Sequence, residues 1–177
     1  MTTLAACATT PQADRLAELE AVLAANDSAT LALELWCERH AIADPPEVLA
    51  LPVVGERAAI APDAATMLDL QPGETIAVRN VRLVCGDTTL SKARNFYVPE
   101  RLPAEMNHLL DTTSLPFGRV VASLGYTRER LETTRGPTGG CAPDTVLSHR
   151  AMLRLPDGRP LSLLAECYTP EVLAAAR

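Results

Sequence analysis

Two pairs of apolar segments, each joined by a short turn, constrain the fold of this chain more than any other feature of its sequence. The pairs cover residues 76–84 with 90–98 and residues 146–155 with 161–168. Gly86-Asp87 separates the first pair and Asp157-Gly158 the second. Apolar runs of this length, separated by Asp and Gly, are typical of antiparallel hairpins. We therefore expect two hairpins within one antiparallel sheet.

Apolar residues at helical spacing precede these hairpins. They recur at every third or fourth position within residues 14–25, which predicts an amphipathic helix. Ser28 can cap a second helix with its side-chain oxygen, and Leu31, Leu35 and Trp36 would share the apolar face of that helix. The sequence therefore predicts two helices ahead of the strands.

Shorter signals fill the rest of the chain. They predict a strand or irregular β segment within residues 48–60, a short helix or turn at 61–70, a helix from Pro99, a tight loop at 115–118, a strand at 124–131, and a mobile Gly- and Pro-rich connection at 136–143. Helices combined with hairpin-connected strands indicate the α+β class. We expect an antiparallel sheet of about six strands with helices covering it.

The size and charge of the chain limit what it can be. Its 177 residues, 47% of them hydrophobic, suffice for the core of one domain. We expect residues 1–13, which are small and polar, to form a flexible tail, and residues 14–177 to form a single, monomeric domain. A net charge of −6 without a basic patch argues against nucleic-acid binding. Nothing approaches the apolar run of about 18 residues that a membrane span requires.

The five cysteines leave two interpretations of the compartment open. They are Cys7, Cys37, Cys85, Cys141 and Cys167, and their spacing matches no zinc site, so no metal is expected. Reduced thiols in a cytoplasmic protein are the simpler interpretation. However, residues 4–7 resemble the lipobox of a bacterial lipoprotein, although no apolar leader precedes them. If translation starts upstream, Cys7 would carry lipid in the periplasm and the other four cysteines could pair.

Two charged residues interrupt strands that are otherwise apolar. Arg79 lies in the first predicted hairpin and Glu166 in the second. A charge inside a sheet must be paired or must serve a ligand, because burying an uncompensated ion costs several kcal/mol. Alternation along a strand would instead turn both side chains to solvent. Periodicity alone leaves both interpretations open.

Short segments spread over roughly residues 26 to 170 carry a resemblance to a known family. They are residues 79–87, 93–99, 116–119, 126–128 and 159–166, with the sequences RNVRLVCGD, ARNFYVP, PFGR, YTR and RPLSLLAE. In order and spacing they resemble the chorismate pyruvate-lyase family, whose members remove pyruvate from chorismate to leave 4-hydroxybenzoate. The resemblance implies a six-stranded antiparallel sheet, a ligand enclosed beneath helical flaps, and no metal or organic cofactor.

The resemblance also assigns roles to individual residues. Arg79 matches the family's carboxylate-binding arginine, Glu166 its catalytic glutamate, and Phe117 the residue whose backbone N–H meets the ligand. A guanidinium can bind a carboxylate through two hydrogen bonds, and a buried glutamate with a raised pKa can transfer a proton during elimination. The resemblance therefore implies that Arg79 and Glu166 face one enclosed cavity.

Two positions depart from the family pattern. Asn95 stands where the family usually has a second arginine, and Ala29 replaces a larger apolar residue on the second helix. Arg94 precedes Asn95 and so falls on the opposite face of its strand. A second cation for the two carboxylates of chorismate would have to come from Arg128 or Arg82.

An enzyme and a binding module are the two functions left open, and the presence of both Arg79 and Glu166 favours the enzyme. The enzyme would be a carbon–oxygen lyase acting on chorismate or a related enolpyruvyl or cyclohexadiene acid. Glu166 and Arg79 would be catalytic, and the small anionic ring would contact Arg79, Phe117, Asn95, Ala29 and Arg128. The fold also resembles the UTRA effector-binding domains of GntR-type regulators, which favours a non-catalytic binder of an aromatic carboxylate. Chorismate is cytoplasmic, so an exported lipoprotein would lack the substrate of the enzyme.

Overall fold

The computed structural model describes residues 11–54 and 59–174 and has fourteen elements in chain order. They are α1 (Pro11–Ala24), α2 (Ala29–Arg39), β1 (Val48–Pro52), α3 (Ala64–Met67), β2 (Ala77–Cys85), β3 (Thr88–Tyr97), η1 (Pro99–Arg101), α4 (Ala104–Thr112), α5 (Phe117–Val120), η2 (Ala122–Leu124), β4 (Thr127–Arg135), β5 (Leu147–Arg154), β6 (Pro160–Tyr168) and η3 (Pro170–Leu173). Helix α1 begins at Pro11, so residues 11–13 are helical and do not belong to the expected tail. Residues 1–10, which include Cys7, lie outside the described residues.

The strands form one antiparallel sheet of six, in the order β1-β2-β3-β6-β5-β4. The α+β class and both hairpins predicted from the sequence, β2–β3 and β5–β6, are confirmed. The two hairpins join through β3 and β6, where Ala93 lies opposite Glu166 and Asn95 opposite Leu164. This long-range pairing brings the two segments that the sequence singled out side by side.

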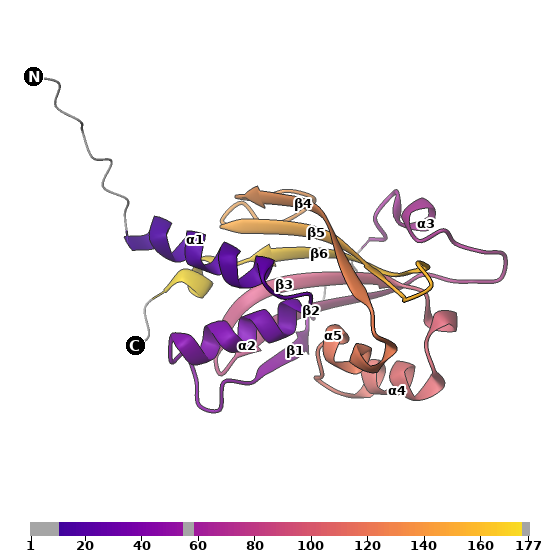
Figure 1. The fold of residues 1–177 in the computed structure, drawn as a ribbon, viewed down its shortest axis with the longest axis horizontal. Coiled ribbons are helices and arrows are strands. Elements are labelled where there is room, and N and C mark those ends of the chain that lie inside the picture. The colour runs from indigo at the N-terminus through magenta and orange to yellow at the C-terminus, as the bar shows by residue number, and fades with distance from the viewer. Residues whose placement is uncertain (1–10, 55–58, 175–177) are drawn as a thin grey trace, which may run out of the picture.

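Helices cover one face of the sheet much more fully than the other. On the covered face, to which Val81 and Ala93 point, one cluster packs α1 and α2 on the sheet and a second packs α4 and α5. Helices α1 and α2 lie at one end of this face and α4 and α5 at the other, while α3 stands apart (Figure 1). The open face, to which Phe96 and Met152 point, carries α3 over part of its length. The sheet therefore has two different surfaces that could hold a ligand.

The buried face of α2 differs from the face that periodicity predicted. Ser28 caps the helix by accepting a hydrogen bond from Leu31 N–H at 3.2 Å, as expected. Leu31 and Leu35, however, are 48% and 40% exposed, whereas Trp36 is fully buried and its indole N–H donates to Val172 O. Because α2 packs against the sheet, α1 and α5 together, these neighbours set its orientation. The remaining buried residues of α2 are Thr30, Ala32, Leu33 and Cys37.

Prolines and a glycine move three boundaries away from the predicted ones. Pro99 starts a 3₁₀ turn, and α4 begins only at Ala104, because the residue before Pro103 is forced into an extended conformation. Pro116 caps the single turn α5, which occupies part of the predicted loop. Strand β4 starts later than expected, because Gly125, at φ 65°, ends the 3₁₀ turn before it.

Four cysteines form two disulfides, which corrects the expectation of reduced thiols. Cys37 of α2 is bonded to Cys85 of β2, and Cys141 is bonded to Cys167 of β6, with Cα–Cα separations of 6.5 and 5.5 Å. The second bond ties the connection at 136–143, expected to be mobile, to the sheet. No helix among the described residues is long and apolar enough to span a membrane. The same residues contain no group of three His, Cys, Asp or Glu side chains that could hold a metal ion.

Candidate functional site

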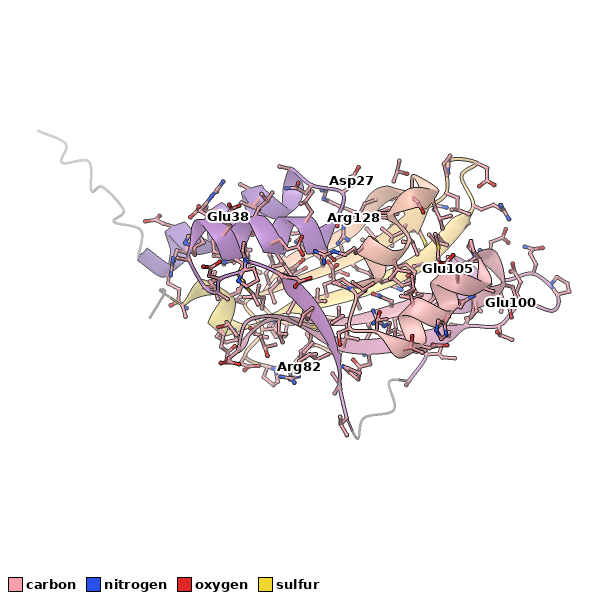
Figure 2. The ribbon with its side chains drawn as sticks, turned by 90° about the horizontal axis from the view of Figure 1, so that it is seen from below. Asp27, Glu38, Arg82, Glu100, Glu105 and Arg128 are labelled. Atoms are coloured by element: carbon pink, nitrogen blue, oxygen red, sulfur yellow. A yellow bond between two sulfur atoms is a disulfide. The ribbon has the colours of Figure 1, made fainter. Side chains whose placement is uncertain are left out.

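A small cavity lies on the covered face, where α2 and α5 begin. Its volume is about 40 Å³. Five of the six site residues predicted from the sequence line it: Ala29, Asn95, Phe117, Arg128 and Glu166. They come from two helices and three strands that are far apart in the sequence. Arg128 lies among the covering helices, away from Arg82 of the opposite face (Figure 2).

Glu166 is a buried charged group that lines this cavity. It is only 4% exposed, and both of its oxygens accept hydrogen bonds from Arg128, at 2.5 and 3.3 Å. The Tyr168 hydroxyl donates to it at 3.1 Å, and His149 Nδ1 lies 3.9 Å away. Arg128 starts on the edge strand β4 and reaches past β5 to make this contact. The charge of Glu166 is therefore balanced inside the protein.

The surroundings shift the pKa values of the three groups around Glu166. Burial alone would lower the pKa of Arg128, but Glu166 together with Tyr168 and Tyr126 outweighs burial and raises it. Burial raises the pKa of Tyr168 well above its ordinary value, and Glu166 adds to that shift. Burial lowers the pKa of His149, with Glu166 opposing and Arg128 adding to the effect. At neutral pH this leaves a cationic Arg128 beside a neutral tyrosine and a neutral histidine.

Asn95 is a polar side chain of the cavity to which no described residue supplies a hydrogen-bond partner. It is 6% exposed, lines the cavity, and its side-chain amide makes no hydrogen bond to any described residue. Its backbone pairs with Arg79 on one side and Leu164 on the other, which fixes its side chain on the covered face. Buried amides are normally hydrogen-bonded. Asn95 thus offers one acceptor and two donor hydrogens to whatever occupies the cavity.

The first residues of α2 border the same space. Ala29 and Thr30 are the first two residues of this helix, and both line the cavity with Phe117 of α5. The first N–H groups of a helix have no partner within it, and the helix dipole makes this end electropositive. A ligand oxygen in the cavity would meet neutral donors in a positive field.

The contacts of Arg79 differ from those that the resemblance implied. It lies on the same face of the sheet as Asn95 but does not line the cavity with Glu166. Its guanidinium donates to Leu115 O at 2.8 Å and Thr113 O at 3.2 Å, in the segment between α4 and α5. Burial lowers the pKa of Arg79, and Tyr97 and Asp111 oppose this shift without outweighing it. The expectation that Arg79 and Glu166 face one cavity is met by Glu166 alone.

Sequence reasoning missed Tyr168 and His149. Tyr168 could have been found, because residues two apart on a strand share a face and it follows Glu166 by two positions. His149 is Glu166's direct neighbour in the register between β5 and β6, and it is 9% exposed. Its position could be inferred only once that register was known.

Comparison with known proteins identifies the fold. No protein-family profile matches the chain. The effector domain of PhnF from Mycobacterium smegmatis has a TM-score of 0.54 at 13% identity, over 81% of this chain and 89% of that domain. For PhnF itself the TM-score is 0.55 at 12% identity, over 84% of this chain and 66% of PhnF. YydK from Bacillus subtilis, a possible transcriptional regulator, gives 0.47 at 16% identity, over 73% of this chain and 62% of YydK.

The likeness to PhnF concerns the fold. PhnF shows that the chain has the fold of the UTRA effector domains, which chorismate lyase resembles. The name of the first of these structures describes an effector domain. This chain spans less than two thirds of the PhnF and YydK chains.

A relative in sequence is much more similar. The uncharacterized protein y4mC of Sinorhizobium fredii (strain NBRC 101917 / NGR234) is 40% identical over 179 residues. The match covers 89% of this chain and 75% of y4mC. The chain therefore belongs to the same protein family as y4mC.

Proposed function

We propose that this protein binds a small organic anion, a ring compound with a carboxylate, in the cavity beneath α2 and α5. The observation that carries this proposal is Asn95, which is 6% exposed, lines the cavity, and has a side-chain amide without a hydrogen-bond partner among the described residues. The UTRA fold, in which small effectors are bound, supports the same interpretation. Glu166 and Arg128 form the polar wall opposite the helices.

Neutral donors would hold the carboxylate of the ligand. Arg128 is already neutralised by Glu166, so it contributes little net charge to the cavity. The first N–H groups of α2 and the N–H of Phe117 would meet the ligand oxygens, as helix N-termini do in other anion sites. Asn95 would complete this set through its amide. Binding of this kind needs no metal or organic cofactor.

The size of the cavity requires a movement on binding. Its volume of about 40 Å³ is well below the roughly 150 Å³ of a cavity that binds benzene. The single-turn helix α5 is the smallest element at its border, and Arg79 fastens the segment before it. We expect α5 and the end of α4 to move outward when the ring enters. Ala29 leaves space on the α2 side, where the related family has a larger residue.

Chorismate lysis is a second candidate, because Glu166 occupies the family's glutamate position and lines the cavity. Three observations weigh against it. Asn95 stands where the family usually has an arginine. Arg79 donates its hydrogen bonds to backbone carbonyls, and the two disulfides are typical of an oxidising compartment. Chorismate is a cytoplasmic metabolite. We therefore place binding before catalysis.

A titration with 4-hydroxybenzoate tests the binding proposal. Asn95→Leu should weaken binding about tenfold or more, because a ligand oxygen would lose its buried hydrogen-bond partner. Asn80→Leu is the matched control, since Asn80 lies on the same pair of strands but points to the open face. Calorimetry on both variants measures the difference. Equal affinities for the two variants, or no binding by the wild-type protein, would contradict the proposal.

The same preparation separates binding from lysis. Wild-type protein incubated with chorismate at high protein concentration should release no pyruvate, which a coupled dehydrogenase assay detects. Stoichiometric pyruvate and 4-hydroxybenzoate would instead establish the lyase.

A further inference from the structure

A groove on the open face of the sheet is much larger than the cavity on the covered face. Its volume is about 1160 Å³. Strands β2, β3 and β6 form its floor, and the connection that contains Cys141 and the segment around Glu171 form part of its walls. A typical small-molecule pocket measures about 300–1,000 Å³, so the groove has ample room for a ligand.

The three positive charges that line this groove lie together without a carboxylate partner among the described residues. Eight described arginines make ion pairs with carboxylates: Arg39, Arg101, Arg119, Arg128, Arg135, Arg150, Arg154 and Arg159. Arg15, Arg79 and Arg130 donate to backbone carbonyls, as Arg94 also does. Arg82, Lys92 and Arg94 complete the described cations, and all three line the groove. None of these three lies within 4 Å of a described carboxylate.

The register of the sheet holds these three cations together. Arg82 and Lys92 are direct cross-strand partners, and Arg94 lies two residues from Lys92 on the same face. Like charges opposite one another destabilise a sheet. Arg82 donates only to the Thr89 hydroxyl and Arg94 only to Gly139 O, so no described partner neutralises either charge. The fold keeps an unfavourable cluster that an anion would neutralise.

The acidic residues of the groove restrict where an anion can bind. Asp87, Asp144 and Glu171 also line it, but no ion pair connects them to the three cations. An anion would be repelled near these carboxylates and attracted to Arg82, Lys92 and Arg94. The available site is therefore the part of the floor formed by β2 and β3.

We propose that Arg82, Lys92 and Arg94 form a second binding site, specific for a small polyanion. Cross-strand partners stand about 5 Å apart, and alternate residues of a strand about 7 Å apart. The ligand therefore carries at least two carboxylate or phosphate groups with about this separation. This site lies across the sheet from the cavity of the proposed function and does not depend on it.

A titration followed by amide chemical shifts tests this site, with citrate and pyrophosphate as carboxylate and phosphate probes and acetate as the monovalent control. The two polyanions should shift the amides of residues 80–82, 92–94 and 139–145, and acetate should bind far more weakly. Shifts confined to the covered cavity, or equal binding of acetate, would overturn the proposal. The stronger of the two probes shows which anionic group the site prefers.

Variants of single cations separate a built site from general charge attraction. Lys92→Gln should weaken citrate or pyrophosphate binding about tenfold, because one charged hydrogen bond is lost. Arg159→Gln removes the same charge from an exposed residue outside the groove and should leave the affinity unchanged. Lys92→Gln should also raise the midpoint of thermal unfolding slightly, because the repulsion from Arg82 disappears. Equal losses of affinity in both variants, or a lower midpoint for Lys92→Gln, would contradict the proposal.

Discussion

Glu166 and Arg128 form a buried ion pair whose partners depend on one another. Their side chains are 5% and 4% exposed, and two hydrogen bonds join them. Desolvating two charges offsets much of their attraction, so such a pair stabilises a fold little compared with apolar residues. Removing only one partner destabilises the fold strongly, because the other charge stays buried without compensation. The pair is therefore better explained by the cavity that it borders than by stability.

Breaking this pair should cost more than replacing it. Glu166→Gln should lower the free energy of unfolding by about 3–5 kcal/mol, because Arg128 would remain charged without a carboxylate. The double variant Arg128→Met with Glu166→Leu should lose less than Glu166→Gln alone. Urea denaturation of the three proteins measures the difference. A double variant that is the least stable of the three would show that the pair itself holds the fold.

Several site residues could be predicted from the sequence, but their partners could not. Glu166 stands out as a charge within an apolar strand, and Asn95 as a departure from a family pattern. Arg128 was expected only as a substitute cation, because nothing near it in the chain shows that it reaches Glu166. That contact depends on β4, β5 and β6 being neighbours. Arg79 was misplaced for a similar reason, since its carbonyl partners come from a different element.

Local and long-range pairings explain which elements could be predicted. The hairpins β2–β3 and β5–β6 follow from turn chemistry, because Asp-Gly and Gly-Asp steps lie between apolar runs. No local signal specifies that β3 pairs with β6, although this pairing places Glu166 beside Ala93. Helix α2 was predicted at the correct position. Its predicted apolar face is correct for Trp36 and wrong for Leu31 and Leu35, since the sheet, α1 and α5 determine that face jointly. Short helical turns such as α5 were not predicted, because the proline that precedes α5 influences only a few residues.

The segment between α4 and α5 should depend on Arg79 for its order. Arg79→Met removes two hydrogen bonds to Thr113 and Leu115, so amides of residues 113–121 should exchange with solvent about tenfold faster. Arg82→Met is the matched control, because Arg82 lies on the same strand but points to the open face. Hydrogen exchange read by mass spectrometry or NMR compares the two variants. Equal exchange in that segment would show that Arg79 does not fasten it.

The two disulfides connect ligand-binding surfaces to the sheet at the scale of the whole molecule. Cys37–Cys85 joins α2, a border of the covered cavity, to β2, and Cys141–Cys167 joins a wall of the groove to its floor. Both surfaces are therefore held by covalent bonds that form in oxidising compartments.

One buried and one half-buried histidine should make the stability of the whole molecule depend on pH in a defined window. Burial lowers the pKa of His149, which faces Glu166, Arg128 and Arg130 from the neighbouring strands and Glu20 from α1. Burial also lowers the pKa of His40, with Arg15 adding to the effect and Glu18 opposing it. In the unfolded chain both imidazoles take up a proton near pH 6.5. The unfolded state therefore binds more protons than the native state just below that pH.

The sign of the dependence follows from this difference. The stability that neutral His149 provides is complete above about pH 6.5 and is lost as the pH falls toward its lowered native pKa, by at most about 1.4 kcal/mol at pH 5.5. Carboxylates with lowered pKa values act at lower pH, such as Glu74, whose pKa the hydrogen bond from Arg101 lowers to about 2. His149→Phe should reduce the loss of stability between pH 7.5 and 5.5, whereas the exposed His108→Gln should not. Urea denaturation at both pH values measures this change, and an unchanged loss in His149→Phe would show that His149 does not cause it.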